Sequence, residues 1–176
     1  MPALPFAALV LGAVLLLMLV ELQLSVAHER YLRAEGAVEP PDDVHRLMRV
    51  AYPASFAAMA GEAIVRGTIA RNELLLGIAL LGVAKALKFW AIASLGRRWS
   101  FRVLVLPGAS LVRTGPYRFL RHPNYIAVLG ELVSVALALQ APVSGTLAVL
   151  GFGALLRRRI RVEERALGLR GPDPAH

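Results

Sequence analysis

The chain is built of long apolar blocks separated by arginine-rich polar segments, and this alternation limits what it can fold into. The first block is long enough to cross a bilayer as one helix, which takes about 20 apolar residues. Hydrophobic residues make up 57% of the sequence and the mean hydropathy is +0.59, whereas a soluble domain contains about 45–50%. The pattern predicts an all-α, polytopic integral membrane bundle of about five transmembrane helices, at Leu4–Leu24, Val50–Val65, Leu74–Leu95, Tyr125–Leu139 and Thr146–Leu156.

The two ends of the chain need separate consideration. The N-terminal block lacks a basic stretch before it and is longer than the roughly 7–15 residues of a signal-peptide core, so we expect it to stay as the first helix. The last block is expected to continue into a basic cytoplasmic helix from Arg157 to about Leu169, whose side chains can reach back to the membrane surface. The Ala141–Gly145 turn is so short that the last two blocks must form an antiparallel hairpin.

The positive charges fall on one side of this predicted topology. With the N-terminus outside, Ser25–Arg49, Gly96–Asn124 and the C-terminus share a side. That side receives sixteen arginines and the other only Arg66 and Arg71, a bias that marks the cytoplasmic side of a membrane protein. Topology therefore explains the formal net charge of +8, and no nucleic acid is expected as a partner. The sixteen are Arg30, Arg33, Arg46, Arg49, Arg97, Arg98, Arg102, Arg113, Arg118, Arg121, Arg157, Arg158, Arg159, Arg161, Arg165 and Arg170.

A polar, basic loop, Gly115–Tyr125, leads directly into an apolar block. Ionisable groups held against hydrocarbon are costly, so they indicate a functional site. Arg121 and His122 can bind a carboxylate or a phosphate. Pro123 lacks an N–H and restricts the residue before it, which fixes where His122 points. Tyr125 offers a hydroxyl or an aromatic face at the start of the next helix.

An acidic pair, Glu163-Glu164, follows the hairpin on the same side of the membrane. Carboxylates can bind an ammonium, a ribose diol or a sulfonium, so a ligand with both an α-carboxylate and an α-amine would satisfy the loop and the pair together. Adjacent helical residues point about 100° apart, so we expect one of the two to contact such a ligand. The alternative is a solvated surface, on which Arg159 pairs with Glu163 and Arg161 with Glu164 at helical spacing.

Together these elements resemble the isoprenylcysteine carboxyl methyltransferase family, and in particular its small bacterial members. The family pattern is Arg-His-Pro-x-Tyr-x-Gly, then a hydrophobic hairpin, then Glu-Glu, and the order and spacing match here. One position departs from it, since Ala127 stands where the family has glycine. The likeness covers most of the chain, and the segments that carry it are Glu29–Glu39, Trp99–Val103, Leu106–Gly108, Gly115–Tyr125 and Arg159–Glu164.

The resemblance implies an integral membrane methyltransferase that uses S-adenosyl-L-methionine. Within a single domain over residues 1–176, residues 1–95 would form a three-span N-terminal part and residues 96–170 the cofactor-binding core. His122 and Arg159 are the expected catalytic residues, because Arg159 matches a family arginine that orients the acceptor's nucleophilic oxygen. The cofactor-binding residues that the family implies are Arg121, His122, Pro123, Tyr125, Glu163 and Glu164.

The implied reaction is O-methylation of a lipophilic acceptor in the membrane. The acceptor group would be a carboxylate or an acidic hydroxyl, on a molecule like a prenylcysteine, an alkylpyrone or an alkylresorcinol. Methyl transfer is an in-line displacement at an already activated sulfonium, so the protein must supply alignment and a dry site more than a strong base. We expect a bacterial inner-membrane protein with membrane lipids around it and its active site facing the cytoplasm. The sequence leaves the oligomeric state open.

Three other functions stay open at this point. Related membrane enzymes methylate phospholipid amines. Membrane sterol reductases share a similar C-terminal site but bind a nicotinamide dinucleotide, for which this chain has no glycine-rich phosphate loop. A non-enzymatic membrane adaptor is the third. The absence of cysteine excludes disulfides, cysteine-ligated metal sites and a thiol nucleophile, and we expect no bound metal.

Charged residues also occur inside the predicted spans. Glu62 and Glu131 are expected either to pair with Lys85 or Lys88 or to line a tunnel for the acceptor. The Glu29–Pro40 segment is a candidate lid over the site. The residues expected to anchor the protein at the membrane interface are Lys88, Phe89, Trp90, Trp99 and Tyr117.

Overall fold

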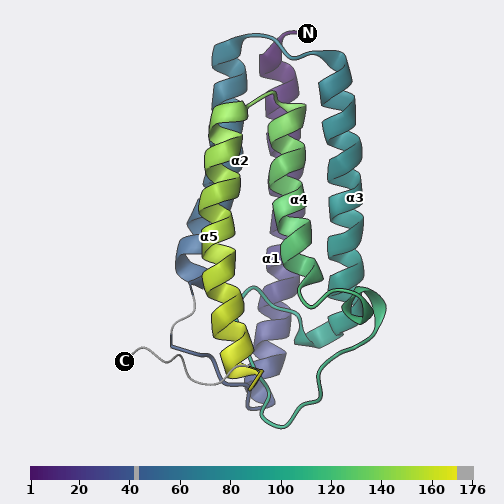
Figure 1. Ribbon diagram of the computed structural model, residues 1–176, viewed down its shortest axis with the longest axis vertical. Helices are drawn as coiled ribbons and strands as arrows, with labels where there is room; N and C mark the ends of the chain where they lie inside the picture. The colour runs from purple at the N-terminus through teal and green to yellow at the C-terminus, as the bar shows by residue number, and fades with distance from the viewer. Residues whose placement is uncertain (42–43, 170–176) are drawn as a thin grey trace.

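The structure, a computed structural model, describes residues 1–41 and 44–169. These residues form five α-helices and two 3₁₀ turns, and the extended segments among them pair only as isolated bridges. The helices run alternately up and down in one bundle, as Figure 1 shows. The all-α prediction is therefore confirmed. In chain order the elements are α1 (Ala3–Ala34), α2 (His45–Arg66), α3 (Arg71–Leu95), η1 (Gly96–Arg98), η2 (Gly115–Arg118), α4 (Pro123–Ala138) and α5 (Pro142–Ala166).

One end of the bundle gathers the polar connections. There α1 ends, α2 begins, the long loop of residues 96–122 joins α3 to α4, and α5 ends (Figure 1). We call this the polar end. The N-terminus and the two short connections, residues 67–70 and 139–141, lie at the opposite end. The structure thus brings together the segments that the topology prediction placed on one side, and the cytoplasmic location of that side stays a prediction.

Small and apolar residues fill the interior of the bundle. Phe56 and Met59 of α2 and Leu132 of α4 are fully buried. Close contact between α3 and α4 depends on Gly77, because a Cβ at that position would run into Ala138. Large apolar side chains also cover the outside, which suits a lipid surface. Examples are Leu9, Leu16, Leu76, Val83, Leu147 and Leu150.

The helices differ in how well they suit a bilayer crossing. Within residues 1–41 and 44–169, two helical stretches are long and apolar enough to cross a membrane, by length and composition only: Ala3–Ala34 and Arg71–Arg98. Helix α4 is apolar but has only 16 residues. Helices α2 and α5 have 22 and 25 residues but are less apolar. The described residues form five α-helices, as many as the predicted spans, and the basic segment expected to follow the last span is the end of α5. A crossing by all five helices stays a prediction.

Helix α1 runs further than predicted, to Ala34 instead of Leu24. Polar residues such as Ser25 are compatible with a helix, and neither glycine nor proline occurs between Leu24 and Gly36. The helix ends just before Gly36, which adopts a left-handed conformation with φ of 83°. Asp42, Asp43 and the residues after Leu169, which include Arg170, lie outside the described residues.

Helix α5 begins earlier than predicted and is continuous. It starts at Pro142, inside the expected Ala141–Gly145 turn, because a proline fits the first turn of a helix without losing a hydrogen bond. The apolar block and the basic segment from Arg157 onward form one helix that ends at Ala166. With α4 it forms the expected antiparallel hairpin (Figure 1), which returns α5 to the polar end.

Four charged side chains form a buried ionic layer across three helices. Lys85 and Lys88 of α3 each lie between Glu21 of α1 and Glu131 of α4, with N–O distances of 2.6–3.1 Å. The hydroxyl of Tyr52 in α2 donates a further hydrogen bond to Glu131 (2.7 Å). The four charges sum to zero, and buried charges are tolerated when they are paired in this way. The expected pairing of Glu131 with a lysine is confirmed, and Glu21 is an additional partner.

The expected places of three charged or aromatic residues are wrong. Lys88 and Trp99 were expected at the membrane interface but are 1% and 3% exposed, because Lys88 belongs to the ionic layer and Trp99 packs beneath the polar end. Glu62 pairs with neither lysine. It accepts hydrogen bonds from the N–H (2.7 Å) and hydroxyl (2.6 Å) of Ser144 and pairs with Arg66, since the first N–H groups of a helix favour a carboxylate.

Candidate active site

The loop before α4 sets the directions of two aromatic side chains. His122 occupies the cap position of α4 and Pro123 follows as its first residue. The carbonyl of His122 accepts the N–H of Tyr125 (3.1 Å), which begins the helix within one turn. As a result the rings of His122 and Tyr125 lie stacked, with centroids 5.5 Å apart and planes inclined by 18°.

The polar end of α5 brings both glutamates to this loop. The hydroxyl of Tyr125 donates a hydrogen bond to Glu163 Oε2 (2.6 Å). His122 Nε2 lies 3.3 Å from Glu164 Oε1, and His122 Nδ1 lies 3.8 Å from Glu163 Oε2. The two carboxylates point in different directions from α5. Glu163 contacts the Tyr125 side of the stacked pair of rings, and Glu164 contacts the His122 side. Both members of the pair therefore belong to the site.

Arg159 lies one helical turn before Glu163 and is buried, with 5% of its surface exposed. Its Nε donates a hydrogen bond to the hydroxyl of Tyr125 (3.0 Å). Its terminal guanidinium nitrogen donates to the backbone carbonyl of Phe101. The hydroxyl of Tyr125 thus accepts from a cation and donates to a carboxylate, which links the loop, α4 and α5 through one atom.

A cavity of about 1120 Å³ opens beside these residues. Pockets for single small molecules commonly measure about 300–1,000 Å³, so this one has room for more than one ligand. At the polar end it is lined by His122, Asn124, Tyr125, Arg159 and Glu163. Its apolar lining includes Leu15, Met18 and Leu22 of α1, Met48 of α2, and Phe152 and Leu156 of α5.

The charged lining of the cavity is mostly basic. Among the described lining residues the only carboxylate is that of Glu163. A concave surface with one sign of charge attracts ligands of the other sign. Burial and the nearby Glu163 carboxylate raise the pKa of Tyr117, so this lining phenol stays protonated at neutral pH. The arginines that line the cavity are Arg49, Arg98, Arg102, Arg113, Arg118, Arg121 and Arg159.

The other residues singled out in the sequence take different places. Arg121 lines the cavity from an exposed position, and Pro123 is buried at the start of α4. Ala127 is buried within α4 and does not line the cavity, and neither do Glu62 and Glu131. The tunnel-lining alternative for the two glutamates is therefore wrong. The residues that the structure does bring together are His122, Tyr125, Arg159, Glu163 and Glu164.

Three features of the site were not foreseen from the sequence. The first is the Phe101 carbonyl that holds Arg159. The others are the indole N–H of Trp99 and the amide oxygen of Asn124, which are buried without a hydrogen-bond partner among the described residues and belong to cavity-lining side chains. Buried polar atoms normally have partners, so both atoms are available to a ligand. A signal existed, since Asn124 lies inside the basic motif and Trp99 in a segment that resembles the family.

Comparisons with known proteins show which family the chain belongs to. The chain is 29% identical over 147 residues to the uncharacterized protein YpbQ of Bacillus subtilis, an alignment that covers 84% of this chain and 88% of that protein. It is 27% identical over 163 residues to an uncharacterized protein of Haemophilus influenzae, covering 92% and 95% of the two chains. The family model for isoprenylcysteine carboxyl methyltransferases matches residues 75–168, which include the loop, the hairpin and both glutamates. That match spans more than half of the chain, and the protein therefore belongs to the isoprenylcysteine carboxyl methyltransferase (ICMT) family of integral membrane methyltransferases.

Proposed function

We propose that this protein transfers a methyl group from S-adenosyl-L-methionine to an oxygen atom of a lipophilic acceptor in the membrane. One observation carries the proposal. His122, Tyr125, Arg159 and Glu163 converge at the polar end of a cavity whose remaining lining is largely apolar. A polar cofactor needs the polar end of such a cavity, and a lipophilic acceptor needs its apolar lining.

The donor set fits the cofactor. Arg121 offers positive charge and His122 a ring N–H to its α-carboxylate, while Glu163 offers a carboxylate to its α-ammonium or ribose hydroxyls. The buried amide oxygen of Asn124 has no partner among the described residues and suits a ligand N–H or O–H. When bound, S-adenosylmethionine supplies an activated methyl group on a sulfonium. The residues that would hold it are Arg121, His122, Pro123, Tyr125, Glu163 and Glu164.

The remaining task of the protein is to orient the acceptor and to exclude water. Arg159 is buried and cationic, and it would orient and stabilise an acceptor oxyanion. A carboxylate or an acidic hydroxyl is already ionised, so it needs no base. For a less acidic phenol, the charge of Arg159 lowers the cost of ionisation, and His122 is the candidate to accept the proton. Holding the two reactants in line in a dry site supplies much of the rate.

The acceptor class follows from the lining. The leucines, methionines and Phe152 suit an alkyl or prenyl chain, and the surplus of arginines disfavours a second cation beside the cofactor. The apolar lining would suit either kind of acceptor, and it is the surplus of arginines that favours O-methylation over methylation of a phospholipid amine. A prenylcysteine carboxylate and the hydroxyl of an alkylpyrone or alkylresorcinol are the acceptors we propose. The arginine bias supports a cytoplasmic polar end, and the inner membrane of a bacterium is the proposed location.

Binding of S-adenosylhomocysteine, the demethylated cofactor, tests the proposal without knowledge of the acceptor. Isothermal titration of the detergent-purified protein is expected to give saturable binding of S-adenosylhomocysteine and none of NADPH. His122→Ala and Glu163→Ala are each expected to weaken that binding about tenfold, because each removes a charge-assisted hydrogen bond. Glu35→Ala, an exposed glutamate at the same end, serves as the control. Binding of NADPH but not of S-adenosylhomocysteine would overturn the methyltransferase proposal in favour of a reductase.

A further inference from the structure

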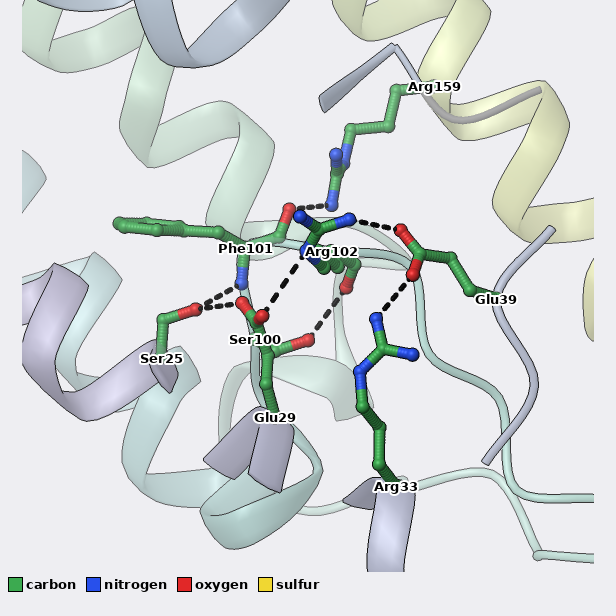
Figure 2. A network of polar contacts seen from close by, with 8 residues as sticks. All are labelled: Ser25, Glu29, Arg33, Glu39, Ser100, Phe101, Arg102 and Arg159. Atoms are coloured by element: carbon green, nitrogen blue, oxygen red, sulfur yellow. Dashed lines mark hydrogen bonds and ion pairs between the residues drawn. The ribbon is translucent and has the colours of Figure 1, made fainter. Parts of the chain in front are cut away.

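Arg159 is held at its outer end by a segment far from it in sequence. The carbonyl that accepts its guanidinium belongs to Phe101, in the stretch that follows η1. Figure 2 shows this carbonyl pointing toward Arg159, with side chains from the end of α1 gathered on the other side of the same peptide. The position of Arg159 therefore depends on what fixes residue 101.

Two carboxylates from the first part of the chain bind Arg102, and we call Arg102 with Glu29 and Glu39 the Arg102 clamp. Arg102 lies 2.6 Å from Glu39 Oε1 and 3.3 Å from Glu29 Oε2 (Figure 2). Arg33 holds the other oxygen of Glu39. These side chains are partly buried, with 25% of Glu39 and 31% of Arg102 exposed. Arg102 therefore has a carboxylate on two sides and little freedom to turn.

Backbone and hydroxyl contacts complete the attachment. The N–H of Phe101 donates to Ser25 Oγ (2.8 Å), and the Ser25 hydroxyl donates to Glu29 (2.8 Å) (Figure 2). Val38 and Val105 exchange two backbone hydrogen bonds of 2.9 and 3.0 Å. The peptide at residue 101 is thus tied to α1 on one face and presents its carbonyl to α5 on the other.

The two arginines beside Glu39 favour its ionised form. Burial by itself would raise the pKa of Glu39, but the hydrogen bonds and charges of Arg102 and Arg33 outweigh it and lower that pKa below its usual 4.5. A single exposed ion pair is worth little, whereas several charges in a partly buried network hold geometry better. The clamp is such a network.

We propose that Glu39 and Arg102 are positioning residues, which set the Phe101 carbonyl and through it the direction of the Arg159 guanidinium. This inference rests on the proposed function, because the clamp acts on Arg159, which belongs to the proposed methyl-transfer site. The consequence reaches the cofactor-binding residues: Arg159 bonds to the hydroxyl of Tyr125, and that hydroxyl bonds to Glu163. Loss of the clamp would loosen all three.

A double-mutant cycle on the affinity for S-adenosylhomocysteine tests the inference without an acceptor. In the otherwise unchanged protein, Glu39→Gln is expected to weaken binding about fivefold. In an Arg159→Lys background, Glu39→Gln is expected to weaken the binding of S-adenosylhomocysteine less than about 1.5-fold. A lysine cannot bond to the Phe101 carbonyl and the Tyr125 hydroxyl at once as the guanidinium does, so the clamp has no such group left to orient. A purely structural role would give the same factor in both backgrounds, and that result would overturn the inference.

Controls separate the possible failures. Glu35→Gln removes an exposed carboxylate at the end of α1, and it is expected to leave binding unchanged. Arg102→Lys keeps the positive charge but loses the planar guanidinium that contacts Glu29 and Glu39. This variant takes the place of Glu39→Gln in the cycle if Glu39→Gln does not fold. If the unchanged protein does not bind S-adenosylhomocysteine, the proposed function fails and the inference falls with it. If it binds and neither clamp variant alters the affinity, the inference alone fails.

Discussion

Arg159→Ala is expected to reduce methyl transfer about 10²–10³-fold, the usual cost of removing a preorganised donor from an oxyanion site. Arg159 is buried, and its two described partners, the Tyr125 hydroxyl and the Phe101 carbonyl, aim it at the polar end of the cavity. The affinity for S-adenosylhomocysteine is expected to fall less, about as far as in Glu39→Gln, because Arg159 acts on Glu163 only through the hydroxyl of Tyr125. The assay is the transfer of radiolabelled methyl from S-adenosylmethionine into organic-soluble material, in membranes supplied with an S-prenylcysteine or an alkylresorcinol.

The neighbouring arginine is the matched control. Arg158 is exposed on the same turn of α5 and does not line the cavity, so Arg158→Ala removes an equal charge from the polar end without touching the site. Transfer by Arg158→Ala is expected to stay within about twofold of the unchanged protein, as is usual for surface substitutions. Equal losses for both variants would show that the rate depends on the overall positive charge and not on Arg159.

Glu131→Ala is expected to lower the free energy of unfolding by about 3–5 kcal/mol, as found when one partner of a buried ion pair is removed. The change leaves two lysines facing Glu21 alone, and it also takes away the acceptor of the Tyr52 hydroxyl. The measurement is denaturant or thermal unfolding of the purified protein in detergent. Low recovery of folded protein from membranes would be the first sign of the loss.

A second variant shows whether the loss of stability comes from the unbalanced charge or from the lost packing of the side chain. The pair Glu131→Leu with Lys85→Leu restores a neutral layer of Glu21 and Lys88, and it is expected to recover most of the stability, since apolar replacements of buried ion pairs are often neutral. Glu62→Ala is the control for a carboxylate outside this layer, and it is expected to cost about 1 kcal/mol as a lost helix cap. If Glu131→Ala costs no more than Glu62→Ala, the layer does not stabilise the bundle.

Much of the architecture could be predicted because it depends on local composition. Apolar blocks of bilayer length predict helices, and the short segment between Leu139 and Pro142 forces a hairpin whatever the rest of the chain does. Helix ends were harder, because polarity does not stop a helix. The serine and charged residues after Leu24 continue α1 until Gly36 allows the chain to turn.

The site residues could be predicted in part. His122, Tyr125 and Glu163 came from a motif with a distal partner, and the structure places them in direct contact. The Phe101 carbonyl left no signal, because a backbone acceptor has no residue type of its own. Glu21 was missed because a single acid in a long apolar run draws attention only once its two lysine partners are known.

The sequence by itself determined the helical membrane class, the grouping of the polar segments and the chemistry available at the loop and the glutamate pair. Hydropathy, charge bias and residue spacing are properties of the chain and need no coordinates. Only the tertiary structure decided that four charges neutralise one another inside the bundle, that both glutamates reach the loop, and that the end of α1 holds Arg159 through residue 101. Those contacts join residues dozens of positions apart, and their distances depend on how the helices pack.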